Sequence, residues 1–209
     1  MPTPSSDIAF TSVVKAVQSR RRSRAAYAQM EDQGGFRTAI DDSLVRFLAG
    51  IDTAYLATAN AAGQPYAQHR GGPKGFIRVV DAHTLGFVDY TGNRQYITTG
   101  NLEENDRAFL FLMDYAHQRR IKLWGRARVV EGDADLTARL MPKTYRARPA
   151  QVILFEVAAW DVNCPQHIPK KLDAADVAQA LAKLQARIDS LEVENAALRH
   201  LNLKTGTPS

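Results

Sequence analysis

The tight spacing of short apolar segments constrains the fold of this chain more than any other feature. Segments rich in β-branched and aromatic residues lie at 53–60, 65–71, 75–80, 84–90, 108–115, 120–131 and 152–162. This composition is typical of β-strands, and the Gly, Pro and Asn residues between them indicate turns. Strands this close leave no room for the crossover helices that parallel pairing needs. The pattern therefore predicts an antiparallel barrel or sandwich.

Helices are expected at the margins of this sheet. Residues 41–50 begin with an Asp pair and end at Gly50, which is a typical capping pattern. Residues 133–142 form a second candidate helix that ends at Pro142. The predicted fold class is mainly β, of the α+β type, with peripheral helices.

The C-terminal segment carries a heptad pattern. Its apolar positions step by four and three: Val177, Leu181, Leu184, Ile188, Leu191 and Leu198. Asn195 falls at the next a position, where Asn favours a parallel two-stranded pairing. Arg187 and Glu194 at g would face Glu192 and Arg199 at e of a partner chain. The pattern predicts a dimeric coiled coil, and the alternative is a single helix that packs on the chain's own barrel.

Charge and cysteine content restrict the partners and the location. The formal net charge is +5, and residues 1–30 carry +4 of it through Lys15 and the arginines of the SRRRSR run. No aromatic or recognition-helix pattern accompanies this run, so we interpret it as a solvated basic arm and expect no nucleic acid partner. Cys164 is the only cysteine, which excludes an intrachain disulfide. No apolar run is long enough to span a membrane and no secretory signal is evident, so we expect no membrane partner and a cytoplasmic location.

The stretch TGNRQYITTGNL, at 91–102, indicates an anion site. Gly92 permits a tight turn after the strand 84–90, and Asn93, Arg94 and Gln95 stand at the start of a helical turn. Unpaired N–H groups at a helix start attract anions, and a guanidinium can bind a phosphate through two hydrogen bonds. The alternative interpretation is an ordinary turn followed by a short helix.

Four segments occur in a specific order: GQPYAQHRGG, FVDYTGNRQY, NLEENDRAFLFLMDY and RRIKLWGRARVV. The stretches QHRGGPKGF, GNRQY and the late NCPQHIP narrow the resemblance to one branch. Together they resemble the pyridoxamine 5'-phosphate oxidase-like FMN-binding split barrels, in the branch of flavin-nucleotide-binding proteins. The resemblance covers about residues 36–170. It implies a split β-barrel, FMN as cofactor, and a homodimer with flavin at the subunit interface. The expected domains are a basic helical arm at 1–35, the FMN-binding barrel at 36–171 and the C-terminal helix at 172–209.

The resemblance also implies which residues bind the cofactor. In the oxidases an Arg aligns with Gln68. Because Gln68 carries no charge, a phosphate contact is expected at Arg70 instead. Arg120 aligns with a Gln that lies near the flavin ring in the oxidases. A cation at position 120 would stabilise negative charge on the reduced flavin. The full set that the resemblance assigns to FMN is Gln68, His69, Arg70, Val88, Asp89, Asn93, Arg94, Gln95 and Arg120.

The chain departs from the oxidases near its last strand, where no Arg-x-His pair follows and NCPQHIPKK stands instead. Pyridoxamine phosphate oxidation is therefore not expected. We interpret Cys164 and His167 as part of an irregular loop, and the scattered histidines predict no metal site. We assign no catalytic residues, because the flavin carries the chemistry.

The resulting prediction is a flavin-dependent oxidoreductase that acts on an unidentified small molecule. Three alternatives stay open. The first is a non-catalytic protein that binds or senses flavin nucleotides. The second is a scaffold protein in which the basic arm and the C-terminal helix carry the function. The third is a split barrel that binds haem or a deazaflavin in place of FMN.

Overall fold

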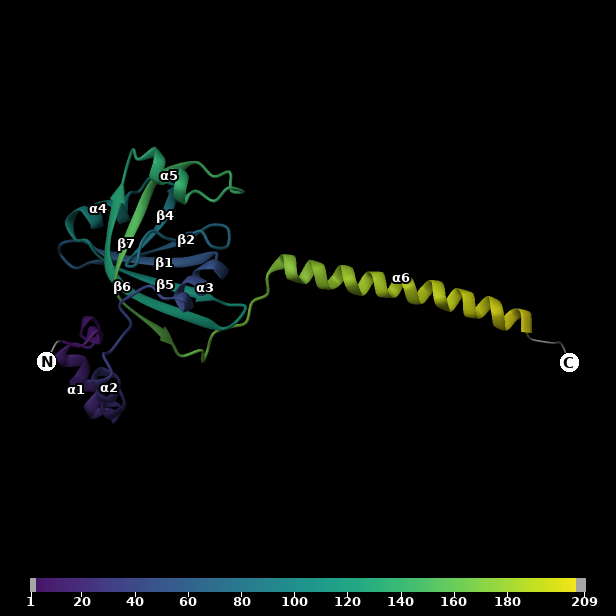
Figure 1. Ribbon diagram of the computed structural model, residues 1–209, viewed down its shortest axis with the longest axis horizontal. Coiled ribbons are helices and arrows are strands. Elements are labelled where there is room, and N and C mark those ends of the chain that lie inside the picture. Colours follow the sequence, from purple (N-terminus) through teal and green to yellow (C-terminus); the bar gives the residue numbers. More distant parts are fainter. Residues whose placement is uncertain (1–2, 206–209) are drawn as a thin grey trace. The chain divides into compact units, whose positions relative to one another are not determined.

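The computed structural model describes residues 3–205 and divides the chain into two compact units. The first unit extends to Ile168 and holds the N-terminal helices and the barrel, and the second begins at Pro169 and holds one long helix (Figure 1). Across residues 3–205, no helix has both the length and the apolar character that crossing a membrane requires.

The first unit is built on a seven-stranded sheet in which every pairing is antiparallel, as predicted. Its strands are β1 (Thr53–Ala59), β2 (Pro65–Gly71), β3 (Arg78–Val79), β4 (Thr84–Tyr90), β5 (Arg107–Asp114), β6 (Arg119–Val130) and β7 (Pro149–Asn163). Their order in the sheet is β2-β1-β5-β6-β7-β4-β3. The sheet curls around a core of buried aliphatic and aromatic side chains, so the fold is an α+β split barrel (Figure 1).

Both predicted helices beside the sheet are present, and the first confirms the capping pattern in the sequence. Helix α3 (Asp42–Gly50) begins after Asp41, whose carboxylate accepts hydrogen bonds from the backbone N–H groups of Ser43 and Leu44. Helix α5 (Ala134–Leu140) begins after Asp133, whose carboxylate accepts from Leu136 N. Such caps satisfy N–H groups that have no partner inside the helix.

The segment predicted as a strand at 75–80 is a strand only at Arg78–Val79. Gly75 has a φ of 76°, which is outside the β region, and Phe76 N donates to Pro73 O in a turn. Phe76 and Ile77 are nevertheless buried in the core. These two residues are apolar because they lie in the core, and not because they form a strand. The prediction of a full strand was wrong, since a buried turn and a buried strand have the same apolar composition.

The N-terminal arm packs on the barrel through aromatic rings. It consists of η1 (Ser5–Ile8), α1 (Ser12–Arg20) and α2 (Arg24–Asp32). The ring of Phe36 lies 5.3 Å from that of Phe10 and is stacked on Trp124 of β6 at 5.0 Å. Ser5 Oγ also donates to the carbonyl of Phe36 at 2.5 Å. These contacts attach the arm to the sheet beside β6.

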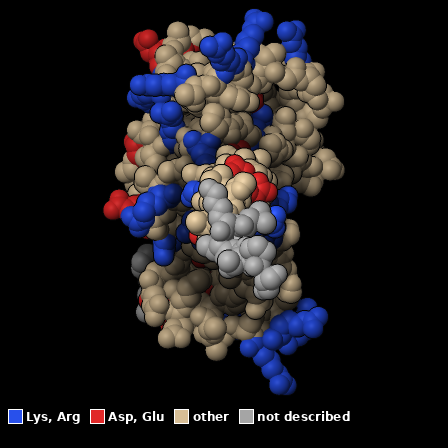
Figure 2. Space-filling model, turned by 90° about the vertical axis from the view of Figure 1, so that its right-hand side faces the viewer, with Lys and Arg blue, Asp and Glu red and all other residues tan. Residues whose placement is uncertain are grey.

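Acidic residues neutralise part of the basic arm. Lys15 forms ion pairs with Asp7 at 2.5 Å and Glu31 at 3.2 Å, and Arg24 pairs with Glu31. With Glu31 and Asp32 included, the first 35 residues hold five basic and three acidic side chains, a net charge of +2. Basic side chains (blue) still project from the N-terminal helices at the lower edge of the face in Figure 2.

The second unit contains α6 (Ala174–Thr205), a helix of 32 residues. The sequence pattern places a helix in this segment, and the structure confirms it. The predicted domain boundaries at 35/36 and 171/172 stay predictions.

A close backbone approach at Gly125 shapes the long β6–β7 pair. The register of the two strands shifts between Trp124 and Gly125, as at a β-bulge. A Cβ atom at Gly125 would lie 1.9 Å from the carbonyl oxygen of Glu156. Bulges bend the strands that carry them, so this position is where β6 and β7 turn around the core.

We expect Gly125→Ala to lower the free energy of unfolding by about 3 kcal/mol, because the new methyl group must displace backbone. Urea unfolding followed by circular dichroism measures this change. Gly100→Ala is the matched control, since within the described residues no atom beyond the chain neighbours and the backbone of its own helix α4 (Ile97–Glu104) lies within 4 Å of its Cβ position. That control should raise stability by up to about 1 kcal/mol. Equal stability of the two variants would contradict the close approach at Gly125.

Candidate functional site

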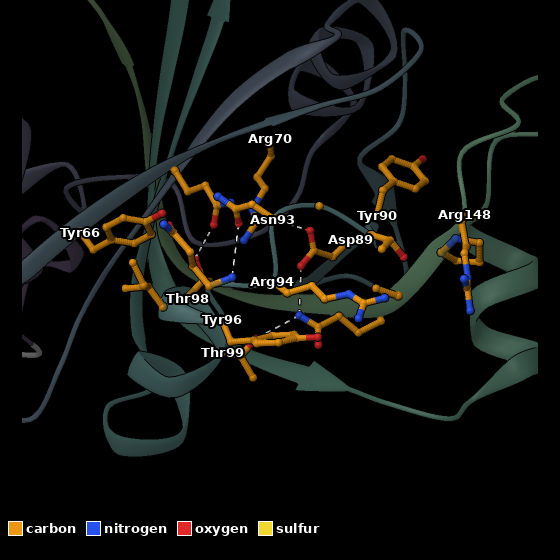
Figure 3. A pocket seen from close by; sticks show the side chains of 18 residues that line it. Tyr66, Arg70, Asp89, Tyr90, Asn93, Arg94, Tyr96, Thr98, Thr99 and Arg148 are labelled. Carbon is orange, nitrogen blue, oxygen red and sulfur yellow. Dashed lines mark hydrogen bonds and ion pairs between the residues drawn. The ribbon is translucent and has the colours of Figure 1, made fainter.

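A polar pocket lies where β2, the β4–α4 turn and the start of β7 meet. Its volume is about 260 Å³. Figure 3 shows Tyr66 and Arg148 on opposite sides of the pocket, with Arg70 and Asp89 between them. The pocket is lined by Tyr66, Gln68, Arg70, residues 89–99 and residues 148–151.

Strand β2 supplies every second side chain to the pocket. Tyr66, Gln68 and Arg70 line it, and the intervening Ala67 and His69 do not. This alternation follows from the pleat of a strand, which directs successive side chains to opposite faces. His69 instead lies with its ring centroid 5.7 Å from that of Tyr55 on β1.

A buried ion pair crosses the middle of the pocket. Arg70 of β2 donates through Nη1 to the carboxylate of Asp89 on β4, and the Gln151 side chain donates to the other carboxylate oxygen at 3.0 Å. Gln151 Nε2 also donates to Thr99 Oγ1 at 3.1 Å. Burial lowers the pKa of the Arg70 guanidinium, and the negative charge of Asp89 opposes this shift. Arg70 Nε is buried and has no hydrogen-bond partner among residues 3–205.

This ion pair joins distant parts of the sheet. Strand β2 is the first strand in the sheet order, and β4 is the sixth. No backbone ladder of the described sheet connects them, so side chains hold the two sides together at this point, which we call the seam. Thr98 of α4 adds a second link, because its Oγ1 donates to Gln68 Oε1 of β2 at 2.9 Å.

The turn after β4 exposes the N-terminus of α4 to the pocket. Arg94 and Tyr96 adopt left-handed conformations with φ values of 59° and 53°, which are uncommon for residues other than glycine. Gln95 N donates to Asn93 Oδ1 at 3.3 Å. Tyr96 is the N-cap residue of α4 and provides no side-chain cap. The side chain of the N-cap residue therefore accepts no hydrogen bond from the first backbone N–H groups of the helix.

Helix α4 is fixed to the barrel by polar contacts. Asn101 Nδ2 donates to Thr58 Oγ1 of β1 at 3.0 Å, and both residues are buried. Asn105 Nδ2 donates to the carbonyl of Ala59 at 3.2 Å. These bonds hold the helix so that its N-terminus stays at the pocket.

The pocket has an excess of positive charge. Among the described residues that line it, Asp89 is the only acidic one, and that carboxylate is paired with Arg70. Arg94 and Arg148 also line the pocket, and within residues 3–205 neither forms an ion pair with a carboxylate. Thr91 N donates to the carbonyl of Arg148 at 3.0 Å, which fixes the start of β7 beside the turn. Two unpaired guanidiniums and an uncapped helix N-terminus are suited to binding a phosphate.

The structure brings six of the nine predicted residues together. These are Gln68, Arg70, Asp89, Asn93, Arg94 and Gln95. Val88 lies on the opposite face of β4, where it packs in a small cluster with Leu140 and Val152. Arg120 lies at the far end of β6, where its Nε donates to Cys164 O at 3.1 Å. The roles of all nine residues in flavin binding stay predictions.

Several lining residues were not predicted. Tyr66 precedes Gln68 and Arg70 at the two-residue period of a strand, so the alternation in β2 indicates it. Thr98 and Thr99 follow from the helix start at Ile97. Arg148 and Gln151 have no local signal, because only the pairing of β7 with β4 brings them to the turn.

The other predicted features form no second site in the part of the chain that the structure describes. Cys164 is exposed, and the contacts of residues 3–205 include no hydrogen bond between Cys164 and His167. No group of three or more His, Cys, Asp or Glu side chains suited to a metal ion occurs in the same range.

The fold and the pocket together define an α+β split barrel with a basic, polar pocket at its seam. The sequence profile of the pyridoxamine 5'-phosphate oxidase family matches residues 40–164, which include β2, the β4–α4 turn and β7. The chain belongs to this family. No curated protein matches the sequence.

Solved structures provide more distant likenesses. HupZ of Group A Streptococcus is 18% identical with a TM-score of 0.48, covering 64% of this chain and 99% of that chain. An FMN-binding protein of Syntrophomonas wolfei is 9% identical with a TM-score of 0.46, covering 71% and 97%. The haem storage protein HutZ of Vibrio cholerae is 16% identical with a TM-score of 0.39, covering 58% and 93%.

We expect Arg70→Met to lower the free energy of unfolding by about 1–3 kcal/mol, because it leaves the Asp89 carboxylate, which is 15% exposed, without its cation. Urea unfolding of the ligand-free protein measures this loss. The double variant Arg70→Met/Asp89→Leu should regain most of it, since a buried ion pair can be replaced by apolar groups at little cost.

Arg148→Met is the matched control, because it removes an exposed guanidinium from the same pocket. Its effect on stability should be below about 0.5 kcal/mol. If Arg70→Met is no more destabilising than Arg148→Met, the ion pair does not hold the seam.

Proposed function

We propose that this protein binds FMN with the flavin phosphate in the seam pocket, and that it acts in flavin-dependent redox chemistry. One observation carries the proposal: Arg94, Arg148 and the uncapped N-terminus of α4 face one polar pocket in a chain of this family.

The charge balance of the pocket fits a phosphate monoester. Asp89 neutralises Arg70, so the charge available to a ligand comes from Arg94 and Arg148. A phosphate monoester carries about −1.5 to −2 at neutral pH, which matches two free guanidiniums. Asn93 and Gln95 add amide groups that are suited to phosphate or ribityl oxygens.

The chain's own contribution to the reaction is binding and orientation. A bound flavin supplies hydride or electron transfer. The described residues that line the pocket include no histidine, no cysteine and no unpaired carboxylate. The polar groups therefore anchor and orient the cofactor, and none is assigned as a proton donor or acceptor. The absence of an Arg-x-His pair after β7 argues against pyridoxamine phosphate as the substrate.

A second copy of the chain completes the flavin site in this proposal. Arg120 and Val130 lie ten residues apart on β6, and Val130 pairs with Val152 next to the pocket. Ten residues of fully extended strand span about 33 Å, and the bend at Gly125 shortens this distance only in part. Arg120 therefore contacts the flavin only if a second subunit carries it to the pocket, which agrees with a homodimer that has flavin at its interface.

The alternative is that the protein binds flavin nucleotides without catalysing a reaction. The composition of the pocket supports this alternative as well as it supports an oxidoreductase. Both functions require FMN. They differ in turnover, because only an oxidoreductase would reduce the bound flavin with a nicotinamide cofactor and pass the electrons to an acceptor.

We expect Arg94→Ala to raise the dissociation constant for FMN by about 10- to 100-fold, the effect of losing a charge-assisted hydrogen bond. Quenching of flavin fluorescence on titration of the ligand-free protein measures this constant. Mass identification of the cofactor released by the purified protein distinguishes FMN from haem or a deazaflavin.

Arg46→Ala is the control for net charge, because Arg46 is exposed on α3 and does not line the pocket. Its dissociation constant should match that of the wild type. Equal losses in both variants would mean that FMN binds elsewhere, and a protein that binds no FMN at all would refute the proposal.

We expect Arg120→Gln to lower the midpoint potential of bound FMN by roughly 20–80 mV, because a nearby cation stabilises the reduced form by about 1–4 kcal/mol. Spectroelectrochemical titration measures this potential. Arg119→Gln, an exchange at the adjacent exposed arginine that pairs with Asp114, should leave the potential unchanged. An unchanged potential in Arg120→Gln rules out a contact between Arg120 and the flavin.

A further inference from the structure

The C-terminal helix α6 presents an uncovered apolar stripe. Leu181 is 60% exposed and Leu184 is 61% exposed, and the other large apolar residues at the same heptad positions are exposed as well. These others are Val177, Ile188, Leu191 and Leu198. Apolar surface on this scale in a helix is typical of a face that another helix covers.

The stripe is narrow, which distinguishes a coiled-coil seam from a face that packs on a sheet. A helix that packs on a globular core has apolar residues at a and d and also at e or g. In α6 the e positions at 185, 192 and 199 carry Gln, Glu and Arg, and the g positions at 187 and 194 carry Arg and Glu. Between Val177 and Leu198 the large apolar residues lie at a and d, as in a coiled coil, except Val193, which is at the outward f position and is 72% exposed.

The charges beside the stripe identify a second copy of the same helix as the partner. In a parallel pair, each g residue faces the e residue five positions later on the other helix. Arg187 then faces Glu192, and Glu194 faces Arg199, so the cross-helix pairs formed by these charges are all attractive. The two-fold symmetry of a homodimer makes each of these pairs twice.

Asn195 selects the parallel orientation. In a parallel, in-register pair, Asn195 at a meets Asn195 of the second helix, and the two amides can hydrogen-bond. In an antiparallel pair, a positions face d positions, and Asn195 would be buried against one of the apolar d residues: Val177, Leu184, Leu191 or Leu198. An unpaired buried amide costs free energy, so the antiparallel arrangement is disfavoured.

We propose that α6 forms a parallel, in-register, two-stranded coiled coil with α6 of a second copy of this chain. The inference rests on the heptads and charges of α6 alone, and it does not depend on flavin binding. A parallel pair has its two-fold axis along the coil, so it is compatible with a barrel dimer that shares this axis.

Disulfide trapping in the full-length protein tests the pairing. With Cys164→Ser as background, Leu184→Cys places a thiol at d, and Ala186→Cys places one at the outward f position. We expect Leu184→Cys to form covalent dimers at least about tenfold faster than Ala186→Cys under mild oxidation, because only the d position brings two thiols within disulfide distance. Equal rates at the two positions would overturn the proposal. Slow cross-linking at both positions would also overturn it, because an antiparallel pair or a helix packed on its own barrel would give that result.

A charge exchange tests the register. In the Leu184→Cys protein, Arg187→Glu should slow cross-linking by roughly threefold to tenfold, because a carboxylate at position 187 would face Glu192 on both sides of the pair. Adding Glu192→Arg should restore the original rate. If the double exchange is as slow as the single one, the two residues do not face each other. FMN affinity measured on the same variants keeps failure of the coil separate from failure of the flavin site.

Discussion

The barrel depends on an ion pair between two strands that no backbone ladder of the described sheet connects. Arg70 and Asp89 lie on β2 and β4, near the two ends of the sheet order, and their bond crosses the seam together with the Thr98–Gln68 contact. A charged pair in this position is costly to desolvate, and it is retained here with an extra hydrogen bond from Gln151. Closing the barrel with polar side chains rather than with a ladder leaves a polar pocket at the point of closure. The fold and the candidate site therefore have one physical origin.

The same ion pair determines which charges a ligand can use. Arg70 alone would be the most deeply buried cation of the pocket, yet Asp89 compensates it, and the accessible positive charge moves outward to Arg94 and Arg148. The helix N-terminus at Ile97 also lines the pocket. An anionic group is therefore attracted to the outer part of the pocket, and an uncharged group is favoured at the inner wall. This polarity fits a cofactor with a phosphate at one end.

Much of the fold was predictable, because strand composition and turn spacing act locally. The antiparallel sheet, the cap at Asp41, the helix after Asp133 and the C-terminal helix all follow from local patterns in the sequence. Phe76 and Ile77 show where this reasoning ends, since a buried turn resembles a strand in composition. In the site, Asn93, Arg94 and Gln95 were predicted from the Gly-Asn-Arg turn that follows a strand. His69 and Val88 were grouped with residues on the opposite face, although strand alternation separates them. Arg148 and Gln151 needed the β4–β7 register, which only the folded chain provides.

The left-handed conformations of Arg94 and Tyr96 have a consequence for which residues suit the turn. Each conformation costs about 1–2 kcal/mol relative to a helical or extended one. Glycine adopts the same backbone angles without that cost, yet the turn carries a guanidinium and a phenol ring at the two positions. The rest of the folded barrel therefore offsets a strain that glycine would avoid, and replacing either residue by glycine would relax the backbone while removing a polar side chain from the pocket.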